Sequence, residues 1–219
     1  MSDEMIWAIV PAKLGETSKE RLGAVLAPEL RRRLAHAMLD DVLEALGRAR
    51  GLAGIVVVSR DAQALALAQS RGACTVADSG GGLNASVQDG IEACRAHGAT
   101  GVLVAMGDLP LLEAADVETA LEALPSRGLV LVPSLDGTGT NLLAARPAEL
   151  VRPAFGPGSL ARHLELARDA DVTAVLQPCA GAALDVDTPD DLERLLAGPP
   201  RTSSQRLLAA GPARAIANG

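Results

Sequence analysis

Short apolar runs alternate with longer segments of helical spacing along most of this chain, and this alternation restricts its fold more than any other feature. We predict strands at residues 6–10, 55–59, 74–77, 101–106, 129–133, 141–145 and 172–175. The predicted helices are residues 28–47, 62–71, 84–97, 114–124, 159–170 and 189–196. Such alternation is typical of βαβ units, so we expect an α/β fold with a mainly parallel, mixed sheet and helices on both faces.

The length and composition suit one domain followed by a tail. The chain has 219 residues, 48% of them apolar, which is enough for a substantial single core. We assign residues 1–198 to this domain. Residues 199–219 follow the last helical pattern and are rich in Pro, Gly, Ser and Ala, so we expect a flexible, disordered tail.

The charge and the scarcity of aromatic residues exclude some classes of partner. The net charge is −7, and aromatic residues make up 1% of the chain. Nucleic-acid binders need basic patches or exposed rings, so we expect no nucleic-acid partner. An acidic protein can still bind a polyanionic small molecule if divalent cations supply the missing positive charge.

Cysteine usage and hydropathy predict a cytoplasmic protein without membrane contact. Cys74, Cys94 and Cys179 are widely spaced and form no C-x-x-C motif, which favours reduced thiols over disulfides or structural zinc. We find no targeting segment, and no apolar run approaches the roughly 20 residues of a membrane span.

The chain contains only two lysines, Lys13 and Lys19, and both lie in the loop A-K-L-G-E-T-S-K-E-R-L after the first predicted strand. Ligands of open α/β sheets bind where parallel strands end, and an ammonium on a flexible stem suits phosphate. The loop therefore indicates a nucleotide site. Chance placement in an arginine-rich chain is an alternative of equal weight.

Three aspartates are candidate metal ligands. Asp108 directly follows a predicted strand in M-G-D-L-P, while Asp185 and Asp187 alternate in L-D-V-D-T-P and so share one face. Carboxylates at strand ends commonly hold a divalent cation against phosphates. The alternative is that Asp108 is a turn residue and that Asp187 or Thr188 merely caps the last helix.

The glycine-rich segments suggest further ligand contacts. D-S-G-G-G-L-N precedes a predicted helix whose expected cap is Asn84, and free amides there favour an anion or a polar base edge. The segment matches neither G-x-G-x-x-G nor a Walker A loop, which disfavours a Rossmann dehydrogenase or a P-loop enzyme.

Two later segments, G-T-G-T-N and F-G-P-G-S, combine glycines with hydroxyls, and Ser159 begins a predicted helix that can hold a phosphate or carboxylate. Two glycine turns with Ser159 as N-cap are the alternative. We expect His163 on a solvated face of that helix, and His36 and His97 in structural roles.

Taken in order, the segments resemble the guanylyltransferases of deazaflavin coenzyme F-420 biosynthesis, which act on 2-phospho-L-lactate, phosphoenolpyruvate or 3-phospho-D-glycerate. The resemblance runs through I-V-P-A-K, S-K-E-R-L, G-L-N-A-S, M-G-D-L-P, G-T-G-T-N-L-L, F-G-P-G-S-L-A-R-H and L-D-V-D-T-P-D-D-L. G-T-G-T-N followed by F-G-P-G-S is the specific part. The lysine loop and G-D-x-P occur in nucleotidyltransferases generally.

This resemblance implies a Rossmann-like nucleotidyltransferase fold and a Mg²⁺-dependent enzyme that joins GMP from GTP to a small phosphorylated acid and releases pyrophosphate. The implied contacts are Lys13, Lys19 and Arg21 with the triphosphate, Gly82 and Asn84 near the nucleoside, Thr140, Gly156 and Ser159 with the acid, and Asp108, Asp185 and Asp187 with two Mg²⁺ ions. Lys13 and Asp108 are the residues expected to be catalytic.

Several alternatives stay open at this point. Another nucleotidyltransferase of the same fold, acting on a sugar phosphate or a molybdenum cofactor, shares the lysine loop and the Asp108 motif. A non-catalytic nucleotide-binding protein is the alternative from another class. The choice among the three acids, a homodimer, and hand-over of a labile product to the next transferase of the pathway are likewise undecided.

Overall fold

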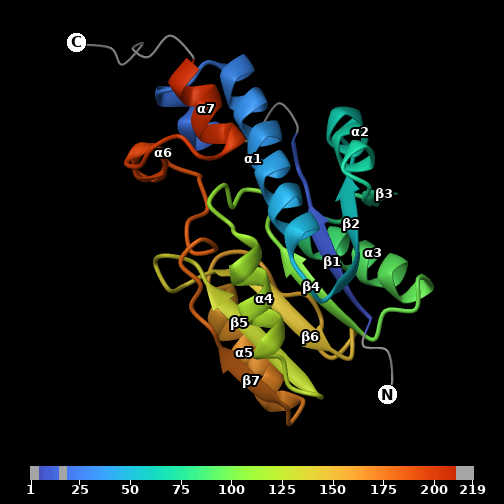
Figure 1. Cartoon of the computed structure of the whole chain (residues 1–219). Coiled ribbons are helices and arrows are strands. Elements are labelled where there is room, and N and C mark those ends of the chain that lie inside the picture. Colours follow the sequence, from blue (N-terminus) through green and yellow to red (C-terminus); the bar gives the residue numbers. More distant parts are fainter. Residues whose placement is uncertain (1–4, 15–18, 211–219) are drawn as a thin grey trace.

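The computed structural model describes residues 5–14 and 19–210, and its centre is a seven-stranded sheet (Figure 1). The strands are β1 (Ile6–Pro11), β2 (Leu52–Ser59), β3 (Cys74–Ala77), β4 (Gly101–Ala105), β5 (Gly128–Pro133), β6 (Thr140–Arg146) and β7 (Thr173–Leu176). Their order across the sheet is β3-β2-β1-β4-β6-β5-β7. Only β6 runs antiparallel to its neighbours among these strands, so the predicted mixed, mainly parallel sheet is confirmed.

Helices cover both faces of the sheet, as predicted. They are the 3-10 helix η1 (Glu20–Ala24) and the α-helices α1 (Pro28–Arg48), α2 (Ala62–Ser70), α3 (Leu83–Ala96), α4 (Ala114–Glu122), α5 (Ser159–Asp169), α6 (Pro189–Leu196) and α7 (Ser203–Ala210). Helices α1, α2 and α4 pack on one face, and α3 and α5 pack on the other.

The central strands β1, β4, β5 and β6 are almost wholly buried because helices cover both faces of the sheet, whereas the edge strands β3 and β7 are more exposed. In β4, Leu103 and Ala105 enter the core under α1, whereas Val102 and Val104 enter the core under α3. This division follows from the two-residue repeat of a strand. With almost no aromatic residues, Leu, Val and Ala make up most of both cores.

A third, smaller apolar cluster lies where η1, α1 and α6 meet. Leu22 of η1 is fully buried there together with Leu34 and Met38 of α1, and with Val186 and Leu195 from the C-terminal part of the chain. This cluster holds η1 against α1. It therefore sets the position of Lys19, the residue that directly precedes η1.

The prediction of a disordered tail was wrong for residues 203–210, which form α7 beside α1 (Figure 1). The carboxylate of Asp41 on α1 accepts hydrogen bonds from the backbone N–H groups of Ser203 and Ser204 at 2.5 and 3.0 Å. The Ser204 hydroxyl donates a third, at 2.6 Å. A buried carboxylate thus satisfies amides that a helix start leaves without partners.

The sequence signal for α7 is a capping box that begins at Thr202. The backbone N–H of Gln205 donates to the Thr202 hydroxyl, and the Gln205 side chain accepts from the backbone N–H of Thr202. The pattern T-x-x-Q is typical of a helix start. The prediction of a tail missed it because that prediction rested on amino-acid composition. The remainder of the predicted tail, residues 211–219, lies outside the described residues.

Across the residues that the structure describes, no helix is long and apolar enough to cross a membrane.

We predict that Asp41→Asn loosens α7, because an amide cannot accept all three hydrogen bonds that the carboxylate accepts. The free energy of unfolding should fall by about 1–3 kcal/mol, measured by urea denaturation, and proteases should cleave near residue 203 more rapidly. Glu44→Gln on the same helix is the control, since Glu44 pairs with the exposed Arg48 and not with α7 in the described residues. Equal losses in both variants would contradict this role of Asp41.

Candidate active site

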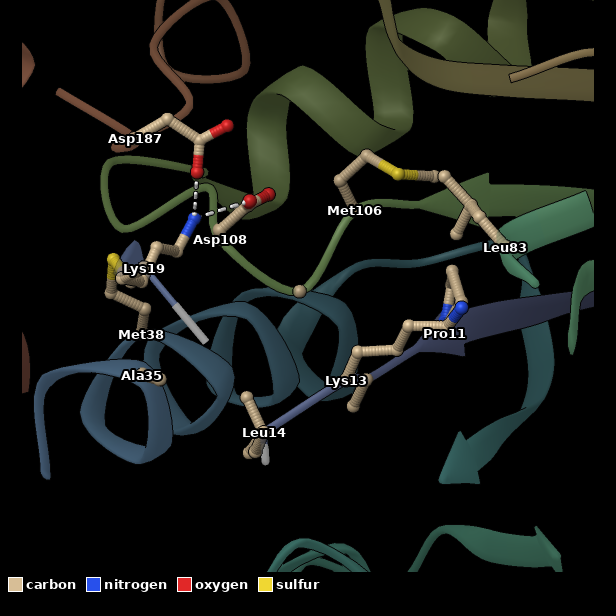
Figure 2. A pocket seen from close by; sticks show the side chains of 12 residues that line it. Pro11, Lys13, Leu14, Lys19, Ala35, Met38, Leu83, Met106, Asp108 and Asp187 are labelled. Carbon is tan, nitrogen blue, oxygen red and sulfur yellow. Dashed lines mark hydrogen bonds and ion pairs between the residues drawn. The ribbon is translucent and has the colours of Figure 1, made fainter. Parts of the chain in front are cut away.

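A pocket of about 250 Å³ lies at the edge of the sheet where β1 and β4 end. The parallel pairing of β1 with β4 brings the loops after these two strands together. The lining residues are Pro11, Ala12, Lys13, Leu14, Lys19, Ala35, Met38, Leu83, Met106, Gly107, Asp108 and Asp187 (Figure 2). Both lysines and two of the three predicted metal ligands therefore line one pocket.

Lys19 is the centre of the charged part of this pocket. Its Nζ donates hydrogen bonds to Asp108 Oδ2 and to Asp187 Oδ1, each at 2.6 Å, and Figure 2 shows the ammonium between the two carboxylates. The Lys19 side chain is only 8% exposed. Burial lowers the pKa of this ammonium, but the two carboxylates outweigh burial, so the pKa is raised and the ammonium stays charged.

The backbone of Lys19 is strained. Its φ is 57°, in the left-handed region that residues other than glycine rarely adopt. This backbone conformation costs about 1–3 kcal/mol. The carbonyl oxygen of Lys19 accepts a hydrogen bond from the Leu22 N–H at 3.0 Å and one from Arg31 Nη1 at 3.4 Å. These bonds and the buried Leu22 hold the strained residue in place.

Asp187 faces the lysine because its neighbour serves as the helix cap. Thr188 is the N-cap of α6, and its hydroxyl accepts from the Asp191 N–H, while the Asp191 carboxylate accepts from the Thr188 N–H and hydroxyl. The predicted alternative of an N-cap thus applies to Thr188. The carboxylate of Asp187 is left to pair with Lys19.

Asp185 lies close to the pair but does not touch Lys19. Its Oδ1 accepts from Asn141 Nδ2 at 3.3 Å, and the same amide group donates to the carbonyl oxygens of Ala182 and Ala183 at 2.9 Å. Burial raises the pKa of Asp185, and the charges of Asp108 and Asp187 raise it further. Three carboxylates therefore share one electrostatic environment.

These acidic residues do not form a ready cage. Within the described ranges, no three His, Cys, Asp or Glu side chains are arranged to hold a metal ion. Two carboxylate oxygens nevertheless converge on the single cation of Lys19, with a third carboxylate near enough to feel their charge. Carboxylate oxygens are donors that suit Mg²⁺, so Asp108 and Asp187 fit such an ion at the place that the Lys19 ammonium occupies.

Lys13 lies on the other side of the pocket. It is exposed, and Figure 2 shows it extending away from Asp108 and Asp187. Burial raises the pKa of Asp78, but hydrogen bonds from Ser86 and Gly80 and the charges of Arg60 and Lys13 produce a net lowering. The Lys13 charge thus acts on Asp78, on the side of the pocket away from Asp108 and Asp187.

Asp78 organises the glycine-rich loop, a role that sequence reasoning missed. Its carboxylate accepts from the Gly80 N–H at 2.6 Å and from the Ser86 hydroxyl at 2.8 Å. Gly82, with φ 95°, is the N-cap of α3 in place of the expected Asn84. The only sequence signal was an acid two residues before a run of glycines, which is typical of an Asx turn.

Asn84 connects this loop to the F-G-P-G-S segment. Its Oδ1 accepts from the Phe155 N–H at 2.7 Å, and its Nδ2 donates to the Phe155 carbonyl oxygen at 3.3 Å. The expectation that Asn84 caps α3 was wrong, because this side chain binds a distant backbone. The two glycine segments are consequently adjacent, although 71 residues separate Asn84 and Phe155 in sequence.

Thr140 and Ser159, two of the predicted acid-binding residues, are buried and do not line this pocket. Thr140 and Ser159 are only 4% and 2% exposed, and Gly158, with φ 70°, is the N-cap of α5 in place of Ser159. Gly156 adopts φ 111°, so glycine is required there. Arg21 is exposed on η1, and in the described part of the chain neither it nor these residues line the pocket.

His163 is fully buried, so its expected place on a solvated helix face was wrong. Its Nε2 accepts a hydrogen bond from the Ala154 N–H at 3.2 Å. The other ring nitrogen, Nδ1, therefore carries the proton and donates to the Thr140 hydroxyl at 3.0 Å. Burial, aided by the charge of Arg162, lowers the pKa of His163 to about 4.

Solved structures place this fold among the nucleotidyltransferases. A protein described as a nucleotide-diphospho-sugar transferase from Desulfovibrio desulfuricans G20 superposes with a TM-score of 0.76 at 21% identity, covering 95% of each chain. The 4-diphosphocytidyl-2C-methyl-D-erythritol synthase of Anaerococcus prevotii gives a TM-score of 0.63 at 13% identity, covering 88% of this chain and 97% of that one. The predicted nucleotidyltransferase-like α/β fold is confirmed.

Sequence comparison identifies the family. Residues 6–209 match the family described as guanylyl transferase CofC like, so this chain belongs to that guanylyltransferase family. A phosphoenolpyruvate guanylyltransferase of Sphaerobacter thermophilus is 40% identical over 86% of this chain and 91% of its own. A 3-phospho-D-glycerate guanylyltransferase of Phenylobacterium zucineum is 36% identical over 89% of this chain and 91% of its own.

We predict that acidification destabilises the protein through His163. Its pKa is lower in the folded state than its ordinary 6.5, so folding favours the neutral ring, and the free energy of unfolding falls as the pH drops from about 6.5 to about 4. One such group contributes a slope of at most about 1.4 kcal/mol per pH unit. Urea denaturation at several pH values should show a shallower slope in His163→Asn.

The control for this experiment is His97→Asn. His97 is exposed at the end of α3, where its ring stacks on Trp7, and its replacement leaves the His163 ring and its contribution to the slope in place. Identical slopes in the wild type and in His163→Asn would contradict the assignment to His163.

Proposed function

We propose that this chain transfers GMP from GTP to the phosphate of a small phosphorylated carboxylic acid and releases pyrophosphate, as a cytoplasmic step of coenzyme F-420 biosynthesis. The observation that carries the proposal is the pocket in which Lys13, Lys19, Asp108 and Asp187 meet at the carboxyl edge of the sheet. Membership of the guanylyltransferase family supports the donor. The names of the relatives support phosphoenolpyruvate as the first acid to test and 3-phospho-D-glycerate as the second.

In this reaction a phosphate oxygen of the acid attacks the α-phosphorus of GTP in line. A new P–O bond forms, the bond from the α-phosphorus to the oxygen that bridges to the β-phosphate breaks, and pyrophosphate leaves with the electron pair. No protein nucleophile is required. The protein's part is to position the reactants and to balance charge, which in our proposal Lys13, Lys19 and Arg21 do at the triphosphate.

We assign Mg²⁺, as two ions, to the side chains of Asp108, Asp185 and Asp187. Bound there, Mg²⁺ would neutralise phosphate oxygens that this acidic pocket otherwise repels. The convergence of Asp108 and Asp187 on one cation supports the assignment. The backbone bond from the Val186 N–H to the Asp108 carbonyl oxygen, at 3.3 Å, keeps the two aspartate segments together.

For the remaining contacts, Gly82 and Asn84 are assigned to the nucleoside side and Thr140, Gly156 and Ser159 to the acid. The hydrogen bonds of Asn84 with Phe155 support this division, because they join the loop at the start of α3 to the loop at the start of α5.

The physiological assembly is also a proposal. We place the protein in a homodimer and propose that the labile product passes directly to the next transferase of the pathway. Enclosing that transferase behind a dialysis membrane should then lower the final product yield. An unchanged yield would exclude direct transfer.

The test of the function is pyrophosphate release with GTP, Mg²⁺ and each acid in turn, with the downstream transferase present to consume the product. Release with phosphoenolpyruvate, 2-phospho-L-lactate or 3-phospho-D-glycerate establishes the reaction and identifies the acid. Silence with all three in a folded sample that binds GTP would overturn the proposal, in favour of a sugar-phosphate or molybdenum-cofactor enzyme or a non-catalytic protein.

We predict that Asp108→Asn lowers pyrophosphate release by about 100-fold or more, because the loss of one charge removes a metal anchor and a partner of Lys19. The matched control is Asp190→Asn, an exposed carboxylate in the first turn of α6. It should retain wild-type turnover. Near-normal turnover of Asp108→Asn would disprove the metal assignment.

We predict that Lys13→Ala lowers kcat more than it raises the KM for GTP. Lys13 is exposed and faces the pocket from the side opposite the carboxylates, so its charge should matter most when charge builds up on the phosphates in the transition state. Steady-state kinetics separate the two effects, and Lys13→Arg should recover part of kcat. A pure rise in KM would show that Lys13 only binds GTP.

A further inference from the structure

Lys19 occupies the position between Asp108 and Asp187 that a divalent cation would need. Its Nζ is 2.6 Å from an oxygen of each carboxylate, and its side chain is almost entirely buried. A metal ion bound to the same two oxygens would lie close to this ammonium, and two cations in close contact repel each other strongly. Lys19 is therefore a competitor of the metal, built into the chain.

Negative charges outnumber positive charges around Lys19. Asp108 and Asp187 share the Lys19 ammonium, the charge of Asp185 acts on the same pair, and Lys13 extends to the other side of the pocket (Figure 2). Displacing Lys19 without giving it a new anionic partner would leave a partly buried ammonium unpaired, which is costly. A triphosphate in the same pocket supplies that partner, and the flexible stem of lysine lets the ammonium change partners.

We propose that Lys19 couples metal binding to nucleotide binding: its ammonium blocks the Asp108–Asp187 oxygens until a nucleoside triphosphate draws it away, so that metal and nucleotide bind cooperatively. The inference rests on the proposed function, because it concerns the same metal and the same triphosphate. Each ligand favours the arrangement of Lys19 that admits the other, which is the thermodynamic requirement for positive coupling between two sites.

The first test measures Mn²⁺ binding to the full chain without nucleotide, by electron paramagnetic resonance of the free ion. Lys19→Met keeps the length of the side chain and removes the competing charge, so it should bind Mn²⁺ about tenfold or more tightly than the wild type. Lys19→Arg keeps the charge and should bind as weakly as the wild type. Adding Asp108→Asn to Lys19→Met should abolish the gain.

Lys13→Met is the matched control, because it removes the other ammonium of the same pocket without touching the two carboxylates. Its gain in Mn²⁺ affinity should be well below that of Lys19→Met. Equal affinities of Lys19→Met and the wild type, or equal gains in Lys19→Met and Lys13→Met, would overturn the proposal. Thermal unfolding of each variant verifies that it is folded.

The second test uses the fact that the chain has only two lysines. Selective ¹³C labelling of lysine gives two ε-methylene signals, which Lys13→Met and Lys19→Met assign. We expect the Lys19 signal to stay in place with Mg²⁺ alone and to move when Mg²⁺ and an α,β-methylene analogue of GTP are added together. A Lys19 signal that shifts fully with Mg²⁺ alone would contradict the coupling. A Lys19 signal that stays in place after both additions would contradict it as well.

The outcomes separate the two proposals. Mn²⁺ binding requires no acid, no nucleotide and no turnover, so it tests Lys19 even if the chain has another reaction. Pyrophosphate release by the wild type without a gain in Mn²⁺ affinity in Lys19→Met would leave the proposed function standing and remove this inference. A gain in Mn²⁺ affinity in Lys19→Met without pyrophosphate release by the wild type would support the role of Lys19 and overturn the proposed function.

Discussion

The two ion pairs of Lys19 are the interaction on which the rest of this pocket depends. They join residues that are 89 and 168 positions apart in the sequence, so no local preference can produce them. They arise because β1 and β4 are neighbours in the sheet and because α6 begins beside the same edge. This acidic chain thereby concentrates negative charge at one point, and the buried ammonium of Lys19 partly neutralises it.

Around that centre, polar side chains from the glycine-rich segments hold loops together. Asn141 fixes the segment before Asp185, Asn84 fixes Phe155, and Asp78 shapes the glycine-rich loop. Each bond gives a side-chain partner to backbone groups of a loop, and such groups are costly to bury unpaired. The loops at the edge of the sheet are therefore rigidly connected, which is what catalysis by positioning requires.

Regular elements were predictable because their signals are local. Each predicted strand and helix of residues 1–198 has a counterpart in the structure, since the two-residue and 3.6-residue repeats are written directly in the apolar positions. The exceptions have specific causes. The capping box at Thr202 was missed because the prediction for residues 199–219 relied on composition. Gly82 caps α3 in place of Asn84, whose side chain binds a distant loop. Gly158 caps α5 in place of Ser159, which is buried.

The sequence alone determined the α/β class, the positions of the strands and helices, and the family, whose motifs lie in order along the chain. It also indicated that Lys13, Lys19, Asp108 and Asp187 belong to one site, because parallel strands end at one edge. Only the tertiary structure decided which charges touch, that His163 is buried and neutral against Thr140, and that Asp41 anchors α7. These contacts depend on distances between segments remote in sequence, which periodicity and composition do not encode.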